Sequence, residues 1–251
     1  MENDSNIPNA AAPSRYAERS QWLLAELVII IAGVLIALAI DEWRGKVEDA
    51  NLEREYLTQL IIDLRVTEEK MAAAETSNAV SETAARQFVA AFEDSELVEL
   101  DLVRQWLSEI RYVDNPVPVL GTAEALVSTG DLRLVRNPNT RSEITQYLSR
   151  SRDFWLVPLY QLEERHRYLG FQIQALAEMH GISPRHRSGL LRDTSEQEAE
   201  ADSAEFFAQS QAYSLVAELA DIKDSMSSFR KSISAEATEL RESLELLPSS
   251  Q

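Results

Sequence analysis

Cysteine is absent from the 251 residues, and glycine and proline are scarce, with 7 and 8 copies. The lack of cysteine excludes disulfides, thiolate metal sites and cysteine nucleophiles, and it is compatible with either the cytoplasm or the periplasm. A sheet protein of this length needs many tight turns, and such turns are rich in glycine and proline. The scarcity of both residues therefore predicts an all-α protein built from long helices.

Basic side chains are also in deficit, because 24 lysines and arginines stand against 42 aspartates and glutamates, for a net charge of −18. Affinity for nucleic acid comes mainly from lysine and arginine side chains that neutralise phosphates. The sequence therefore predicts no nucleic-acid partner. An acidic surface is also repelled by anionic headgroups, so contact with a lipid bilayer is predicted to occur by hydrophobic insertion.

Motifs of known chemistry are missing as well. The sequence contains no GxSxG, Walker or GxGxxG motif, and its three histidines have no HExxH or comparable spacing. His166 lies on an apolar helical seam, which favours a buried core histidine over a metal ligand. We predict no enzymatic activity, no catalytic residue, no metal site and no cofactor. A membrane-bound hydrolase with a carboxylate or histidine metal site in the helical part is a weaker alternative.

One long apolar run is present, from Trp22 to Ile40, and it contains a single charge, Glu26. The run is apolar on all sides, as is typical of a membrane span. Trp22 and Trp43 flank it, about 31 Å apart along a helix. This length matches the hydrocarbon core of a bilayer and places one indole anchor at each interface. The sequence therefore predicts a transmembrane helix.

The predicted organisation has an N-terminal tail (1–19), a transmembrane helix (20–43) and a helical bundle (44–251) with an acidic loop (192–205). The start of the chain is acidic, which argues against a cleaved signal peptide. Counting positive charges on the two sides does not decide the orientation. Because a short tail before an uncleaved anchor commonly stays in the cytoplasm, we expect a single-pass protein of the bacterial inner (cytoplasmic) membrane with a periplasmic C-terminal domain.

Four residues of the predicted span lie on one helical face, at spacings of 7, 4 and 4: Glu26, Gly33, Ala37 and Asp41. Gly33 and Ala37 form a small-x-x-x-small pattern, which lets a second helix approach closely. This face predicts packing against other membrane proteins or against a second copy of the chain. The presence of Glu26 in the predicted span has two possible explanations. It is either a functional carboxyl inside the membrane or a side chain that reaches the nearby headgroups.

Beyond the span, three segments carry apolar residues at helical or heptad spacing. The first continues from the membrane helix as a stalk, and its stripe comprises Leu57, Leu60, Leu64 and Met71. The second begins at Pro138, after a short helix that ends at Gly130, and is expected to kink at Pro158. The third runs over residues 203–247, and its stripe comprises Leu215, Leu219, Ile222, Met226, Phe229, Ile233, Leu240, Leu244 and Leu247. Three such stripes bury one another most simply in an antiparallel helical bundle with coiled-coil-like seams.

An uncharacterised family of bacterial single-pass membrane proteins (a domain of unknown function) resembles the chain in two regions. The first is AELVIIIAGVLIALAIDEW (25–43) followed by LEREYLTQLIIDL (52–64), which resembles the family's GE(I/L)xLVVxGILIAL-x-I-(N/D)-(N/D)-W membrane helix and the charged helix after it. The second is TAEALVSTGDLRLVRNPNTRSEITQYL (122–148), which resembles the family's ELxSSGxLxLIxNxxLRxxLxxYY region. The family's activity is unassigned, so the resemblance implies an architecture and no mechanism.

Two hypotheses for the function follow. The first is a non-enzymatic accessory or scaffold subunit of a larger membrane protein complex, since a span with a packing face is joined to a bundle without a catalytic motif. The alternative is a membrane-anchored sensory or ligand-binding helical module. The tail before the span is too short to carry a signalling output domain, which favours the first hypothesis.

Overall fold

A computed structural model of the chain describes residues 15–93, 98–154, 158–182 and 203–247, with side chains from Glu26 onward in the first range. Within these ranges the chain forms helices and connecting loops and contains no strand. The prediction of an all-α protein is therefore confirmed. The chain divides into two compact units, Met1–Arg54 and Glu55–Gln251, and helix α1 (Arg15–Glu93) contributes to both.

In the first unit, the described part of α1 carries large apolar side chains that are exposed on all sides of the helix. Ten of them lie between Leu27 and Ile40 and are 49–71% exposed, and Trp43 is 66% exposed. Within the described part of the chain, no helix has an apolar segment long enough to cross a membrane. The transmembrane helix therefore stays a prediction.

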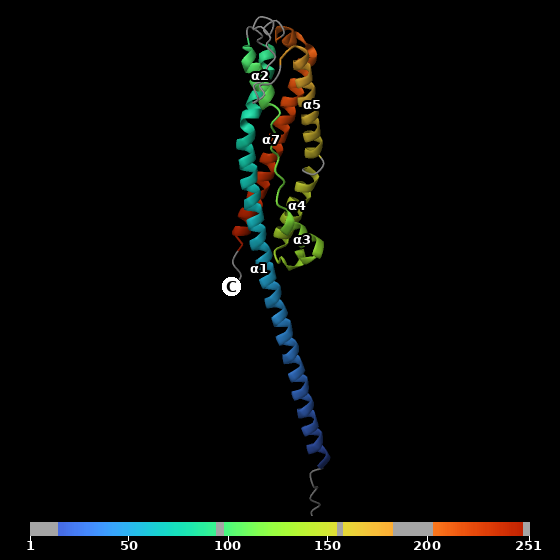
Figure 1. Cartoon of the computed structure of the whole chain (residues 1–251). Coiled ribbons are helices and arrows are strands. Elements are labelled where there is room, and N and C mark those ends of the chain that lie inside the picture. The colour runs from blue at the N-terminus through green and yellow to red at the C-terminus, as the bar shows by residue number, and fades with distance from the viewer. Residues whose placement is uncertain (1–14, 94–97, 155–157, 183–202, 248–251) are drawn as a thin grey trace, which may run out of the picture. The chain divides into compact units, whose positions relative to one another are not determined.

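The second unit contains the remainder of α1 and the other helices of the described residues. These are α2 (Leu100–Glu109), α3 (Gly121–Thr129), the 3₁₀ turn η1 (Asp131–Leu134), α4 (Pro138–Phe154), α5 (Tyr160–Met179) and α7 (Ser210–Glu245), and residues 203–208 are also helical (Figure 1). As predicted, α4 begins at Pro138, and Gly130 ends α3 in a left-handed conformation with φ of 81°. At the position of the predicted kink, Pro158, the chain forms a π-helical turn (158–159) that precedes α5.

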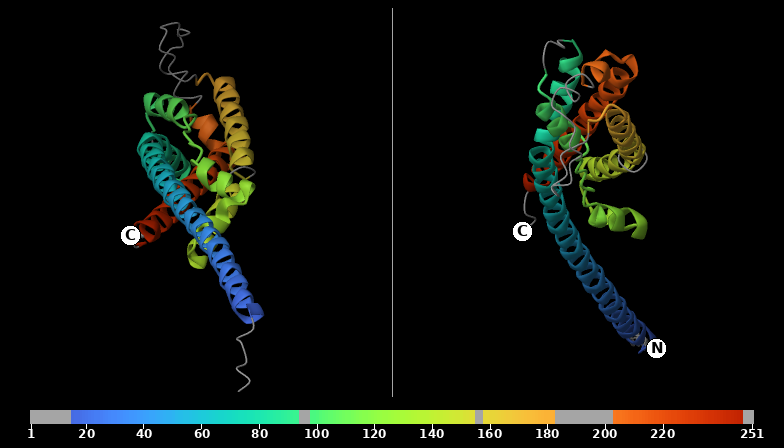
Figure 2. Two further views of the ribbon diagram at one scale, coloured as in Figure 1. Left: turned by 90° about the horizontal axis from the view of Figure 1, so that it is seen from below. Right: turned by 45° about the horizontal axis from the view of Figure 1, so that its top comes forward.

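The long helices of the second unit run antiparallel, as predicted. Residues that rise in number along α1 pair with residues that fall in number along α7, in the ion pairs Glu68–Arg241, Glu75–Arg230 and Arg86–Asp224. Helix α5 lies beside α7 (Figures 1 and 2), and the Arg165–Glu218 ion pair joins the two. The second unit is therefore an antiparallel helical bundle.

Two apolar clusters form the core of the bundle. In the first cluster, α1, α2, α5 and α7 meet around Phe88, whose ring lies against those of Trp106 and Phe206. The second cluster joins α1 to α3, α4 and the C-terminal half of α7. Leu60, Leu64 and Met71 of the predicted stripe are all buried in these clusters. Burial of each such side chain contributes about 1.5–3 kcal/mol.

Polar residues interrupt the inner faces of α1 and α7 within the first cluster, which extends from Met71 to Ala91 on α1 and from Ala212 to Ile233 on α7. The inner face of α1 repeats at spacings of 4 and 3 and consists of Leu60, Leu64, Thr67, Met71, Ala74, Asn78, Ser81, Ala85 and Phe88. The inner face of α7 repeats in the same way and consists of Ala212, Val216, Leu219, Lys223, Met226, Arg230, Ile233, Ala237, Leu240 and Leu244. Both faces are apolar near their ends and polar in the middle. The middle of the bundle is therefore a polar layer.

Candidate functional site: a buried polar layer beneath an extended segment

An extended segment, residues 112–120, crosses the polar layer between α2 and α3 (Figure 1), and we call it the strap. Pro116 and Pro118 fix the backbone φ angle and cannot donate a hydrogen bond, so this segment cannot continue as a helix. Val113 packs against the first apolar cluster and Leu120 against the second. The strap therefore contacts both clusters, and its central residues bond to the polar layer.

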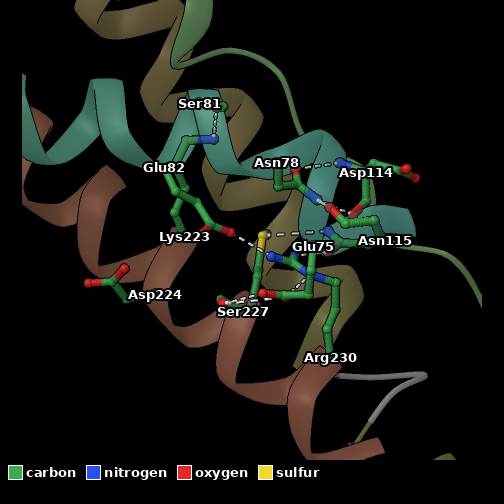
Figure 3. A network of polar contacts seen from close by, with 12 residues as sticks. Glu75, Asn78, Ser81, Glu82, Asp114, Asn115, Lys223, Asp224, Ser227 and Arg230 are labelled. Carbon is green, nitrogen blue, oxygen red and sulfur yellow. Dashed lines mark hydrogen bonds and ion pairs between the residues drawn. The ribbon is translucent and has the colours of Figure 1, made fainter. Parts of the chain in front are cut away.

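Arg230 of α7 is the largest charged group in this layer and is only 1% exposed. Its Nε donates to Glu75 Oε1 at 2.7 Å, its Nη2 to Glu82 Oε1 at 2.6 Å and its Nη1 to Asn115 Oδ1 at 2.9 Å (Figure 3). Each nitrogen of the guanidinium thus has a partner, and two of the three partners are carboxylates. A buried cation with this complement of hydrogen bonds is electrostatically compensated.

Lys223, two turns earlier on α7, is the second buried cation, and no carboxylate of the described residues lies at ion-pair distance from it. Its Nζ donates to Ser81 Oγ at 2.6 Å and to the Tyr112 carbonyl oxygen of the strap at 2.8 Å. Burial lowers the pKa of Lys223 to about 8, against the opposing effect of the Glu82 carboxylate, and the Arg230 guanidinium adds to the lowering. The ammonium therefore depends on the strap carbonyl for one of its two hydrogen bonds.

Asn78 of α1 holds the backbone of the strap with both ends of its amide group. Its Oδ1 accepts from the Asp114 backbone N–H at 2.9 Å, and its Nδ2 donates to the Asp114 carbonyl oxygen at 2.7 Å (Figure 3). Further along, Thr67 Oγ1 accepts from the Val119 N–H at 2.9 Å. With the bonds to the Tyr112 carbonyl, these contacts satisfy four backbone groups of an otherwise irregular segment.

The side chain of Asn115 lies between a donor and an acceptor from two different helices. Its Oδ1 accepts from Arg230 of α7, and its Nδ2 donates to Glu163 Oε1 of α5 at 3.1 Å. An amide satisfies both neighbours at once, because it carries an acceptor oxygen and donor N–H groups. An aspartate here would place a carboxylate against that of Glu163. This position of the strap therefore selects asparagine over aspartate.

His166 of α5 is a core histidine, as the sequence predicted. It is 2% exposed, and its Nε2 lies 3.0 Å from the carbonyl oxygen of Ile110, which can only accept, so Nε2 carries the proton. Burial lowers the pKa of His166 to about 4, and the Lys223 ammonium adds to the lowering, against the opposing hydrogen bond to Ile110. The ring is therefore neutral at physiological pH and anchors the end of α2.

A second polar contact lies at the other end of the strap. Asp63 Oδ2 of α1 accepts from the backbone N–H of Thr122 at 3.2 Å and from its hydroxyl at 2.6 Å. Thr122 lies in the first turn of α3, where backbone N–H groups lack partners inside the helix. Asp63 therefore caps α3 from a different helix.

The polar layer adjoins a groove on the surface of the bundle. Glu75 and Arg230 also line a groove of about 510 Å³ between α1 and α7, together with Met71, Ala72, Lys231, Ser234, Ala235, Thr238, Glu239 and Glu242. Lys223, the buried amine with the lowered pKa, is not among these lining residues. Among the described residues, no group of three or more His, Asp or Glu side chains could hold a metal ion.

The residues predicted for the membrane-helix packing face belong to the first unit. Glu26, Gly33, Ala37 and Asp41 are all exposed on α1, within the first unit. A Cβ atom added at Gly33 would meet no described atom within 4 Å. Of the two predicted interfacial anchors, Trp43 is exposed on the same helix, and the side chain of Trp22 lies outside the described residues.

Lys223 and Arg230 were not predicted to face the core, although their spacing in the sequence indicates this orientation. The 3 and 4 spacing that joins Leu219 to Met226 and Ile233 passes through both of them. Charged residues at such positions are normally counted as interruptions of an apolar stripe. Here they are part of the seam.

Comparison with known proteins yields no relative. No protein-family model matches the chain, and no curated protein or solved structure shows significant similarity to it. The resemblance to the bacterial single-pass family stays a prediction.

Proposed function

We propose that the chain is a non-enzymatic accessory or scaffold protein, anchored in a bacterial inner membrane by the helix from Trp22 to Trp43. On this proposal the membrane helix packs against other membrane proteins, and the helical bundle outside the membrane docks against the larger assembly. The single observation that carries the proposal is the exposure of the apolar part of α1.

Ten large apolar side chains between Leu27 and Ile40 lie open in the folded chain and face all directions around the helix. Water is a poor environment for such a surface, because contiguous exposed apolar area is costly and marks a site of contact with membrane or protein. A partner helix covers one stripe, whereas a bilayer covers every side. The apolar run starts at Trp22, upstream of the first described side chain, and its full length suits a hydrocarbon core.

Gly33 supports a helical partner within the membrane. The described part of the chain leaves the space around Gly33 open, so its own fold gives no packing reason for a glycine there. A glycine in a helix interior costs roughly 0.5–1 kcal/mol relative to alanine. A close approach by another helix, along the face that Gly33 shares with Ala37, gives the missing side chain a use.

Extraction from membranes tests the anchor. The full-length chain is expected to stay with the membrane pellet in alkaline carbonate. Val34→Arg, near the centre of the span, is expected to release a large fraction, because a charge at that depth costs about 2.5–3.5 kcal/mol. Val47→Arg is the matched control, since Val47 is an exposed valine of the same helix beyond the span. Release of the unmodified chain by carbonate would contradict the anchor.

A further inference from the structure

The strap is held in a manner that suits an exchangeable peptide. Four of its anchoring points are backbone groups, namely the Tyr112 carbonyl, the Asp114 N–H and carbonyl, and the Val119 N–H. Any extended segment presents the same groups. The partners are side chains of α1 and α7, two helices that contribute to both apolar clusters. The surface of α1, α5 and α7 beneath the strap, which we call the strap groove, therefore binds mainly backbone groups of the strap.

Two strap side chains add polar contacts to those of the backbone: Asp114 Oδ2 accepts from Ser77 Oγ at 3.1 Å, and Asn115 bonds to two helices. Asn115 is the one strap residue whose side chain bonds both Arg230 and Glu163. The donor and the acceptor flanking it match an amide and no carboxylate. The strap groove therefore selects an extended segment with asparagine at this position.

The apolar attachment of the strap rests on few side chains. Val113 and Leu120 pack against the clusters and Pro118 is buried, whereas Val117 is 59% exposed. Its remaining attachments are hydrogen bonds, which water can replace at small net cost. Opening it also hydrates the Lys223 ammonium, which no described carboxylate pairs. Local opening of such a segment requires less free energy than unfolding of the helices.

We propose that the strap groove is a recognition site for an extended, asparagine-containing peptide segment, and that the chain's own strap fills it until a partner's segment takes its place. The partner is thus a protein with an exposed stretch of the type x-Asn-Pro in extended conformation. This inference does not depend on the membrane anchor, because every residue that carries it lies in the second unit.

Thiol trapping can measure the opening, because the chain has no native cysteine. Ser81→Cys places a thiol of similar size under the strap, at a position that is 2% exposed. Ala85→Cys places one in the first apolar cluster, one turn further along α1, where exposure is 1%. In the full-length chain, the thiol of Ser81→Cys is expected to react at least about 100-fold faster than that of Ala85→Cys, since the second thiol needs a larger opening. Equal rates would overturn the proposal.

A pair of charge-matched strap variants tests the asparagine position. Asn115→Asp, in the Ser81→Cys background, is expected to increase the trapping rate at least about tenfold, because a carboxylate then faces Glu163. Val117→Asp adds the same charge to the exposed side of the strap and is expected to leave the rate within about twofold. The proposal fails if the two variants change the rate equally.

Binding in trans tests the recognition site itself. The probe is an acetylated YVDNPVPVL peptide, the sequence of residues 112–120, added to the chain that carries both Ser81→Cys and Asn115→Asp. Saturating peptide is expected to slow trapping several-fold, because it restores the amide between Arg230 and Glu163. The same peptide with aspartate in place of asparagine is expected to have no effect. Protection by both peptides, or by neither, would overturn the proposal.

Hydrogen exchange on the unmodified chain guards against a folding defect in the cysteine variants. The amides of Asp114 and Val119 are protected by side-chain acceptors, Asn78 and Thr67, rather than by a helical backbone. They are expected to exchange at least about tenfold faster than amides in the middle of α7. Exchange of the strap amides at the rate of the α7 amides would contradict a strap that opens by itself.

Discussion

Replacing Arg230 by methionine is expected to cost about 3–5 kcal/mol of folding free energy, because it leaves buried carboxylates without their counter-charge. The cost falls unevenly on the two acidic partners. Glu82 has a side chain that is 11% exposed and loses its ion pair within the described network, whereas Glu75 is 27% exposed and keeps Ser227 and Lys231. Adding Glu82→Gln to the Arg230→Met variant should therefore restore about 1–3 kcal/mol of the lost folding free energy, since a neutral amide requires no counter-charge.

The assay is urea-induced unfolding of the full-length chain in mild detergent, followed by circular dichroism in the far ultraviolet. Arg86→Met is the matched control, because Arg86 also links α1 to α7, through Asp224, with both side chains more than half exposed. An exposed pair of this kind contributes at most about 1 kcal/mol. The reasoning is refuted if Arg230→Met costs no more than Arg86→Met, or if Glu82→Gln makes the Arg230 variant less stable still.

Three further predictions concern single groups. Burial lowers the pKa of Lys223 from 10.5 to about 8 in the folded chain, so the unfolded chain binds more protons between these values and stability rises with pH there. Urea unfolding at about pH 7.5 and about pH 10.5 should show a gain of ~3 kcal/mol from this group, absent in Lys223→Met. The pKa of His166 falls from 6.5 to about 4 on folding, so its contribution is complete above pH 6.5 and is lost as the pH falls toward 4. Between about pH 7 and about pH 4, His166→Gln, which keeps a donor for the Ile110 carbonyl, should lose ~3 kcal/mol less than the unmodified chain, and an equal loss would contradict this. Asp63→Ala should destabilise the bundle by about 1–2 kcal/mol in the same assay, because the first turn of α3 loses its cap, and a change below about 0.3 kcal/mol would argue against that role.

Periodicity in the sequence was sufficient to predict the helices and many of the residues in the core. The spacings of 4 and 7 that separate Leu60, Leu64 and Met71 predicted the buried face of α1, and Pro138 predicted the start of α4. His166 was assigned to the core because it falls on an apolar seam, and it is buried there. Such features are local, since a helix presents the same face about every seven residues.

The polar layer could not be predicted in the same way. Lys223 and Arg230 were counted as breaks in a stripe, because a charge inside a bundle is tolerated only when partners surround it. Those partners come from distant parts of the chain: Glu75 lies 155 residues before Arg230, and Asn115 lies 115 residues before it. No local pattern indicates that an extended segment will supply one of them. The strap was recognised only as a loop for the same reason.

The packing face proposed for the membrane helix rests on spacing alone and has the most direct test. Ala37 and Ala39 are exposed alanines at nearly the same depth of the predicted span, but they point to opposite sides of the helix. Ala37→Leu blocks the proposed face, and Ala39→Leu adds the same side chain where no close helical contact is proposed.

The deciding measurement is extraction of the full-length chain and of these two variants from native membranes in mild detergent, followed by native gels and mass spectrometry. The account predicts a stoichiometric membrane-protein partner that co-migrates with the unmodified chain and with Ala39→Leu, and that is lost with Ala37→Leu. A chain that migrates alone or only with copies of itself would contradict an accessory subunit and favour an autonomous sensory module. A partner retained equally by both variants would contradict the packing face.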